Sequence, residues 1–156
     1  MKMILFILSL FLLSACAPLT STPIPTPTED LEFLAAVQQA RDTLNEFAQR
    51  IQTPHPNRDF VALKVRFTSP DASSQDIWVD NVAYNGTSFE GDMGDDIPAL
   101  KLTFGERISI HTEDILDWMI VEDDKLIGGY TIRLAYRRMT PTEQEIFLRD
   151  AGYAID

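Results

Sequence analysis

The stretch Asp114–Leu134, "DILDWMIVEDDKLIGGYTIRL", decides how this chain folds. Two apolar runs flank an acidic turn at residues 123–125, a pattern that predicts two antiparallel strands joined by a short loop. After the turn, apolar and polar side chains alternate, and period-two alternation is typical of a strand with one buried face. The side chains expected on one face are Tyr130, Ile132, Leu134 and Tyr136, and those expected on the other are Thr131, Arg133 and Arg137.

Two adjacent glycines, Gly128 and Gly129, interrupt the second predicted strand. Glycines inside a strand mark a bulge, or a place where another group packs directly on the backbone. Trp118, on the facing strand, is the side chain expected to fill that space. The alternative is a ligand groove opened by the glycines and walled by Trp118. The candidate binding residues are therefore Trp118, Gly128, Gly129 and Asp117.

Before this hairpin, residues 26–52 have the pattern of one amphipathic helix. Thr26, Pro27 and Glu29 form a start signal in which the Thr caps the first turn and the Glu completes a capping box. Apolar residues then recur at helical spacing and predict a face that packs on a sheet. They are Leu34, Val37, Leu44, Phe47 and Ile51.

The remaining segments predict a mixed fold. Strands are predicted over 59–68, 76–84 and 87–93, and another short strand is predicted after Gly105 within 100–111. Asn85-Gly86 is a preferred hairpin turn. Residues 111–118 resemble one helical turn that Thr112 caps. A second capping box, Thr140 with Pro141 and Glu143, starts a C-terminal helix that should turn Ile146, Phe147 and Ala151 inward. The predicted class is α+β, with an N-terminal amphipathic helix packed on a curved antiparallel sheet of about five or six strands and a short C-terminal helix.

Six short pieces of the chain, in order, resemble a bacterial family known as domain of unknown function 2314. They are "KVRF", "IWVDNV", "FEG", "GERISI", "IxDWMIV" and "GGYTIRL". The resemblance covers roughly residues 60–140, and the most specific part runs from Ile115 to Thr131. It implies a shared fold and no catalytic residue, because the family has no established activity. This chain departs from the family pattern by carrying the N-terminal segment described next.

The chain begins "MKMILFILSLFLLSAC". One lysine followed by a short apolar run is typical of a secretory signal peptide, because a bilayer-spanning helix needs about 20 apolar residues. "LSAC" resembles a bacterial lipobox, which predicts a signal peptide over 1–15 and acylation of Cys16, for example with palmitate. Residues 16–28 then form a Pro/Thr-rich stalk, and 29–156 form one globular domain. We expect a lipoprotein on the inner or outer membrane, with its domain facing the periplasm or the exterior.

Charge is concentrated in the middle of the chain. The whole sequence has a net charge of −11, and residues 71–124 hold 14 acidic residues but only Lys101 and Arg107 as basic ones. Such a surface repels a phosphate backbone and therefore argues against nucleic-acid binding. It suits a cationic ligand or partner, although a solvated acidic surface is the alternative.

Residues suited to catalysis are few. The chain has two histidines, and its single cysteine is Cys16. His111, Asp114 and Asp117 are spaced three apart, so one helical turn would bring them together as metal ligands. A second oxygen-rich group lacks the spacing of a calcium loop. It consists of Glu90, Asp92, Asp95 and Asp96.

These observations favour a lipid-anchored, non-catalytic binding or accessory module of the cell envelope. The predicted partners are the membrane, through Cys16, and an envelope protein or cationic ligand, with no cofactor. The alternative is a small metal-dependent hydrolase that uses the central acidic block and His111.

Overall fold

The computed structural model of the chain describes residues 30–156. The predicted signal peptide (1–15), Cys16, the stalk (16–28) and the capping box at 26–29 lie outside the described residues. The helices of the described part are α1 (Leu31–Asp42), α2 (Leu44–Gln52), α3 (Tyr130–Arg138) and α4 (Pro141–Ala151), with single 3-10 turns at Pro98–Leu100 and Thr112–Asp114. The strands are β1 (Arg58–Thr68), β2 (Ser74–Tyr84), β3 (Phe89–Met93), β4 (Arg107–Ile110), β5 (Ile115–Glu122) and β6 (Lys125–Gly128).

The strands form one six-stranded antiparallel sheet in the order β4-β3-β2-β1-β5-β6. The predicted α+β class and the predicted hairpins are confirmed. Asn85 turns the chain between β2 and β3, since its side-chain oxygen accepts hydrogen bonds from the backbone N–H groups of Thr87 and Ser88. The sheet has two faces, and a different set of helices and side chains covers each of them.

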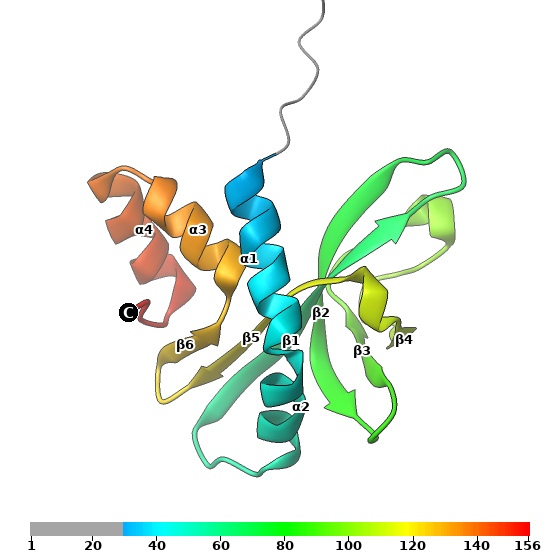
Figure 1. Cartoon of the computed structure of the whole chain (residues 1–156), viewed down its shortest axis with the longest axis horizontal. Coiled ribbons are helices and arrows are strands. Elements are labelled where there is room, and N and C mark those ends of the chain that lie inside the picture. Colours follow the sequence, from blue (N-terminus) through cyan, green and yellow to red (C-terminus); the bar gives the residue numbers. More distant parts are fainter. Residues whose placement is uncertain (1–29) are drawn as a thin grey trace, which may run out of the picture.

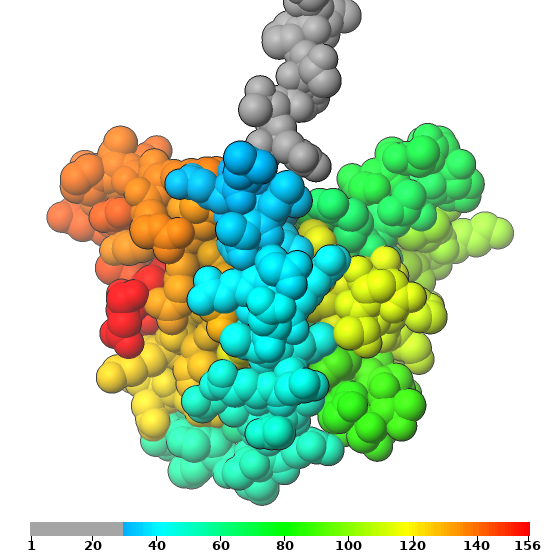
Figure 2. All heavy atoms as spheres, viewed as in Figure 1, coloured from blue at the N-terminus to red at the C-terminus, as the bar shows by residue number. Residues whose placement is uncertain are grey.

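Helices α1 and α2 cover the first face of the sheet (Figure 1) and form a continuous band of side chains across it (Figure 2). Under them lies the main core, in which Phe47 and Leu63 are fully buried.

The prediction of one continuous helix is wrong, because the chain breaks at Thr43. The indole Nε1–H of Trp118 donates to the carbonyl of Ala40 and to the hydroxyl of Thr43, at 3.1 and 3.0 Å. A side chain bonded into the helix ladder is a recognised cause of such a break. The helix begins with Asp30 as N-cap.

The prediction that the second strand of the opening hairpin continues to Tyr136 is also wrong. Strand β6 ends at Gly128, and residues 130–138 form helix α3. Gly128 and Gly129 have φ angles of 71° and 63°, which turn the chain out of the sheet. Within α3, Thr131 and Leu134 are the buried residues, and their spacing is helical.

The second face of the sheet carries a smaller apolar cluster of Ala62, Met119, Val121 and Leu126, against which Ile132 and Tyr153 pack. Helix α4 has the predicted capping box, confirmed at Thr140, Pro141 and Glu143. None of its residues is buried. Phe147 and Ala151 are partly covered as expected, but Ile146 is 44% exposed, contrary to the prediction. Among the described residues, no helix is long and apolar enough to cross a membrane.

Candidate functional site

Trp118 and the two glycines, three of the predicted binding residues, lie together inside the fold. Trp118 is 1% exposed, and a Cβ atom added at Gly128 would lie 2.5 Å from its ring and 2.6 Å from its carbonyl oxygen. The indole therefore packs directly on the Gly128 backbone, which leaves no open groove between them. Trp118 also contacts Phe47, with ring centroids 5.3 Å apart, and meets Tyr130 edge-on. These residues join β5 to α1, α2 and α3.

Asp117, the fourth predicted binding residue, caps helix α3. Its carboxylate is fully buried and accepts hydrogen bonds from the backbone N–H groups of Tyr130 (3.1 Å) and Thr131 (2.7 Å) and from the Thr131 hydroxyl (2.6 Å). Gly129, at the N-cap position, has no side chain to serve this purpose. Burial raises the pKa of Asp117, while these donors and the Trp118 N–H act in the opposite direction.

The three predicted metal ligands are not brought together. Only residues 112–114 form the helical turn, with His111 as its N-cap in place of Thr112, and β5 begins at Ile115. His111 is exposed, whereas Asp117 is buried in β5 and bonded to α3. Within residues 30–156, no group of three His, Cys, Asp or Glu side chains is placed to hold a metal ion. In the acidic group, Asp92 binds Asn81 and Arg107 instead.

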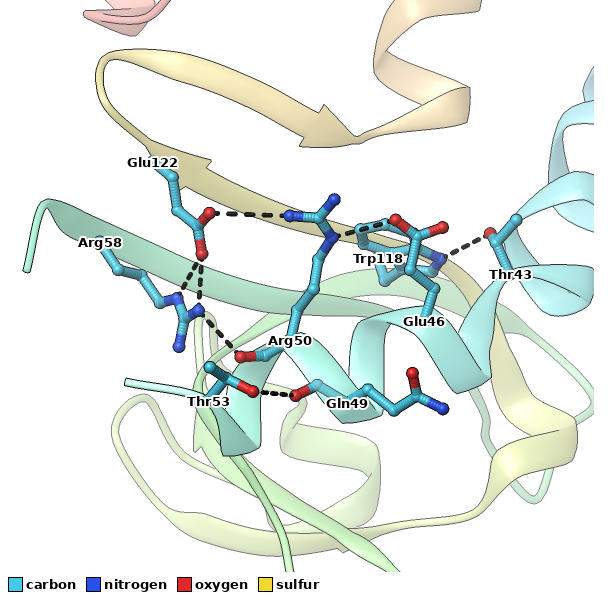
Figure 3. Close-up of polar contacts among 8 residues, drawn as sticks. All are labelled: Thr43, Glu46, Gln49, Arg50, Thr53, Arg58, Trp118 and Glu122. Carbon is cyan, nitrogen blue, oxygen red and sulfur yellow. Dashed lines mark hydrogen bonds and ion pairs between the residues drawn. The ribbon is translucent and has the colours of Figure 1, made fainter. Parts of the chain in front are cut away.

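A cluster of ionic side chains joins α2 to the sheet (Figure 3). Glu122, 8% exposed, forms an ion pair with Arg58 at 2.6 Å and lies 3.8 Å from Arg50. Arg50 also pairs with Glu46, and Arg58 donates to the carbonyl of Arg50. Both oxygens of Glu122 are thus engaged by arginines from two different elements. The cluster anchors α2 over the ends of β1 and β5, and its charges are already paired.

A hollow lined mainly by apolar side chains lies on the second face of the sheet, opposite α1 and α2. Its volume is about 600 Å³. Strands β1, β2 and β5 form its floor, and α3, α4 and the C-terminal segment form its far wall. The apolar groove, as we call it, is lined by Asp59, Phe60, Trp78, Met119, Val121, Ile132, Phe147, Ala151, Gly152 and Tyr153.

The register of the sheet explains how these side chains meet. Phe60 pairs with Val121, and Ala62 pairs with Met119, so the β1 and β5 residues of one face lie side by side. Phe60 is 37% exposed although it is large and apolar. Phe147 and Tyr153 pack edge to face, with ring centroids 6.4 Å apart, across the groove from the sheet. Burial raises the pKa of the Tyr153 phenol. The lining suits an apolar group that is held by removal from water.

The residues that line the groove were not among the sequence candidates, although a signal existed. Phe60 lies on the face of β1 opposite Val61, Leu63 and Val65, and Trp78 lies opposite Ile77 and Val79. A large apolar side chain on the otherwise polar face of a strand indicates a second apolar surface. The sequence alone does not predict the far wall of the groove, because Phe147 and Tyr153 lie near the end of the chain, far in sequence from Phe60 and Trp78.

The chain was compared with known proteins. The family model described as "Uncharacterized protein conserved in bacteria (DUF2314)" matches residues 30–155, a wider span than the 60–140 expected. The chain is 31% identical over 136 residues to "Uncharacterized protein YegJ" of Escherichia coli (strain K12), covering 85% of this chain and 86% of that protein.

A second relative is longer than this chain. "Putative ankyrin repeat protein NMB1133/NMB1171" of Neisseria meningitidis serogroup B is 29% identical over 102 residues, which cover 63% of this chain and 40% of that protein. No solved structure matches the chain.

Proposed function

The chain belongs to the DUF2314 family of uncharacterized bacterial proteins, and from this membership and the apolar groove we propose that it is a lipid-anchored binding module of the bacterial envelope. In this proposal Cys16 carries the acyl chains, and residues 16–28 hold the domain away from the bilayer surface. The groove takes up an apolar segment of an envelope protein and does not transform it chemically.

The observation that carries the proposal is the exposure of apolar side chains in a concave site. The phenyl ring of Phe60 and the indole of Trp78 border a hollow of about 600 Å³, which is within the usual size of a ligand pocket. Removal of apolar surface from water contributes about 25 cal/mol per Å². Aromatic residues are also enriched at protein interfaces. An occupant with apolar side chains therefore gains stability there.

Helix α4 makes the groove adaptable. The helix forms part of the wall through Phe147 and Ala151, yet none of its residues is buried. Segments with little buried apolar surface open at low free energy. A wall of this kind accommodates occupants of different shape without disturbing the main core under α1 and α2.

Site-specific photocrosslinking tests the proposal. A benzophenone amino acid is placed at Phe60 in the groove, and a matched one at Phe104, which is 72% exposed in the connection between β3 and β4. After irradiation of living cells of the native host, we expect a discrete protein adduct from position 60 and none from position 104. Identical adducts from both positions, or adducts with lipid alone at position 60, would contradict the proposal.

A further inference from the structure

A carboxylate without a partner lies beside the apolar groove. Asp80 pairs with Ala62 across β1–β2, and Ala62 pairs with the groove residue Met119 on its other side, so Asp80 and Met119 flank the same residue of β1. Among residues 30–156, the Asp80 side chain has neither a hydrogen-bond partner nor an ion-pair partner within reach. Burial, and then the charge of Asp92, raise the pKa of Asp80.

Trp78 connects this carboxylate to the groove. Its side chain lines the groove and also a smaller hollow of about 280 Å³ that Asp76, Asp80 and Asp95 border. Asp76 is already neutralised by a bidentate pair with Arg66, at 2.8 and 2.9 Å, whereas Asp80 is not. An aromatic ring next to a free carboxylate is a favourable environment for a cation.

A second carboxylate without an ion-pair partner borders the groove. Asp59 lines the groove at the β1 end, and the described residues offer it no ion-pair partner either. One basic group lies beside Trp78: the ammonium of Lys64 is 5.9 Å from the ring centroid of Phe33 and 6.0 Å from that of Trp78. Lys64 shows that the Trp78 ring accommodates an ammonium group. The sequence between residues 71 and 124 has a net charge of −12, and Asp76, Asp80, Glu90 and Asp92 place part of this negative field on β2 and β3.

We propose that the occupant of the groove is a basic amphipathic peptide segment, in which an apolar side chain enters the groove and an adjacent Lys or Arg reaches Asp80 beside Trp78. This inference rests on the proposed function and names the chemistry of its partner. The negative field favours such a segment over phospholipid, whose anionic head groups it repels. Complementary charge also sets which partners are accepted.

Three labelled peptides of equal length test this inference, with the cores Lys-Leu-Phe-Leu-Lys, Gln-Leu-Phe-Leu-Gln and Glu-Leu-Phe-Leu-Glu. Their binding to the full-length chain, held in nanodiscs of neutral phosphatidylcholine, is measured by fluorescence anisotropy, with empty discs as control. We expect the Lys peptide to bind at least about tenfold more tightly than the Gln peptide, and the Glu peptide more weakly than both. In Asp80→Asn the preference for Lys over Gln should fall to about one to threefold. In Asp42→Asn, an equal charge change on exposed α1, it should persist.

The outcomes separate the two proposals. Equal binding of the Lys and Gln peptides, or a Lys preference that survives in Asp80→Asn, overturns the inference about charge and leaves the groove as a binding site. Failure of all three peptides to bind the folded protein overturns the proposed function as well.

Discussion

The carboxylate of Asp117 accepts a hydrogen bond from the backbone N–H of Thr131, fourteen residues later, at 2.7 Å. Through this bond β5 supplies the N-cap that Gly129 lacks, so the end of the hairpin and the start of α3 form one unit. The same strand places Trp118 on Gly128. Consecutive residues of β5 thus fix both sides of the turn that positions the groove wall.

Loss of the Asp117 carboxylate should destabilise the fold strongly. In Asp117→Ala the buried Thr131 hydroxyl and the first N–H groups of α3 lose their acceptor. We expect a loss of about 2–4 kcal/mol in the free energy of unfolding, measured by urea denaturation. Asp42→Ala, at an exposed position of α1, is the control and should change it by about 0.5 kcal/mol or less. A loss below about 1 kcal/mol in Asp117→Ala would show that the cap is unimportant.

Glycine at position 128 should be required for both its conformation and its lack of a side chain. Gly86 has a φ of 97° with nothing within 4 Å of an added Cβ, so Gly86→Ala costs about 1–2 kcal/mol from backbone strain. Gly128→Ala adds a clash with the Trp118 ring and carbonyl, and should cost about 1–3 kcal/mol more. Thermal unfolding of the two variants measures the difference. Equal losses would mean that Trp118 does not pack on Gly128.

Acid should release the tie between α1 and α3. Hydrogen bonds from Arg138, at 2.6 and 2.8 Å, and from the Phe33 N–H lower the pKa of Asp30 from 3.8 to about 2. Because the folded pKa is below the unfolded one, this contribution to stability is complete above about pH 4 and is lost as the pH falls towards 2. Asp30→Asn keeps an oxygen to cap Phe33 but removes the charge. The difference in melting temperature between the two proteins should reach a plateau above about pH 4, be much smaller near pH 2 and vanish only below it. A difference that is independent of pH would contradict the assignment.

Membrane attachment should depend on one thiol. Cys16→Ser removes the sulfur that we propose accepts diacylglycerol, so labelling with a radioactive or clickable fatty acid should disappear and the protein should leave the membrane fraction. Wild type expressed at the same level is the control. Continued fractionation of Cys16→Ser with membranes would indicate that the apolar N-terminal run is itself retained.

Local signals predicted part of this fold well. Thr140, Pro141 and Glu143 lie within one helical turn, and their capping box forms as expected. Asn85-Gly86 likewise contains its own turn chemistry. In both cases the interactions that decide the structure join residues that are close in sequence, and so a short stretch of sequence is enough to predict them.

Where contacts between residues far apart in sequence determine the local structure, the sequence pattern alone was ambiguous. Tyr130, Ile132 and Leu134 alternate as in a strand, but a helix starts there because the backbone N–H groups of Tyr130 and Thr131 donate to Asp117. The break at Thr43 depends on Trp118, 75 residues later. The groove combines Phe60 with Tyr153 from the other end of the domain. The sequence candidates Trp118 and Asp117 proved to be buried supports of this arrangement, and the apolar surface they position lies on the opposite face from Trp118.

The most direct test of the groove uses the two tryptophans of the protein. In a ¹⁵N NMR spectrum each indole N–H gives one signal: that of Trp78 reports on the groove, and that of buried Trp118 serves as the internal control. During titration with the Lys-Leu-Phe-Leu-Lys peptide, the Trp78 signal should shift to saturation while the Trp118 signal stays in place. Saturable binding that leaves the Trp78 signal unmoved would contradict the assignment of the groove as the binding site.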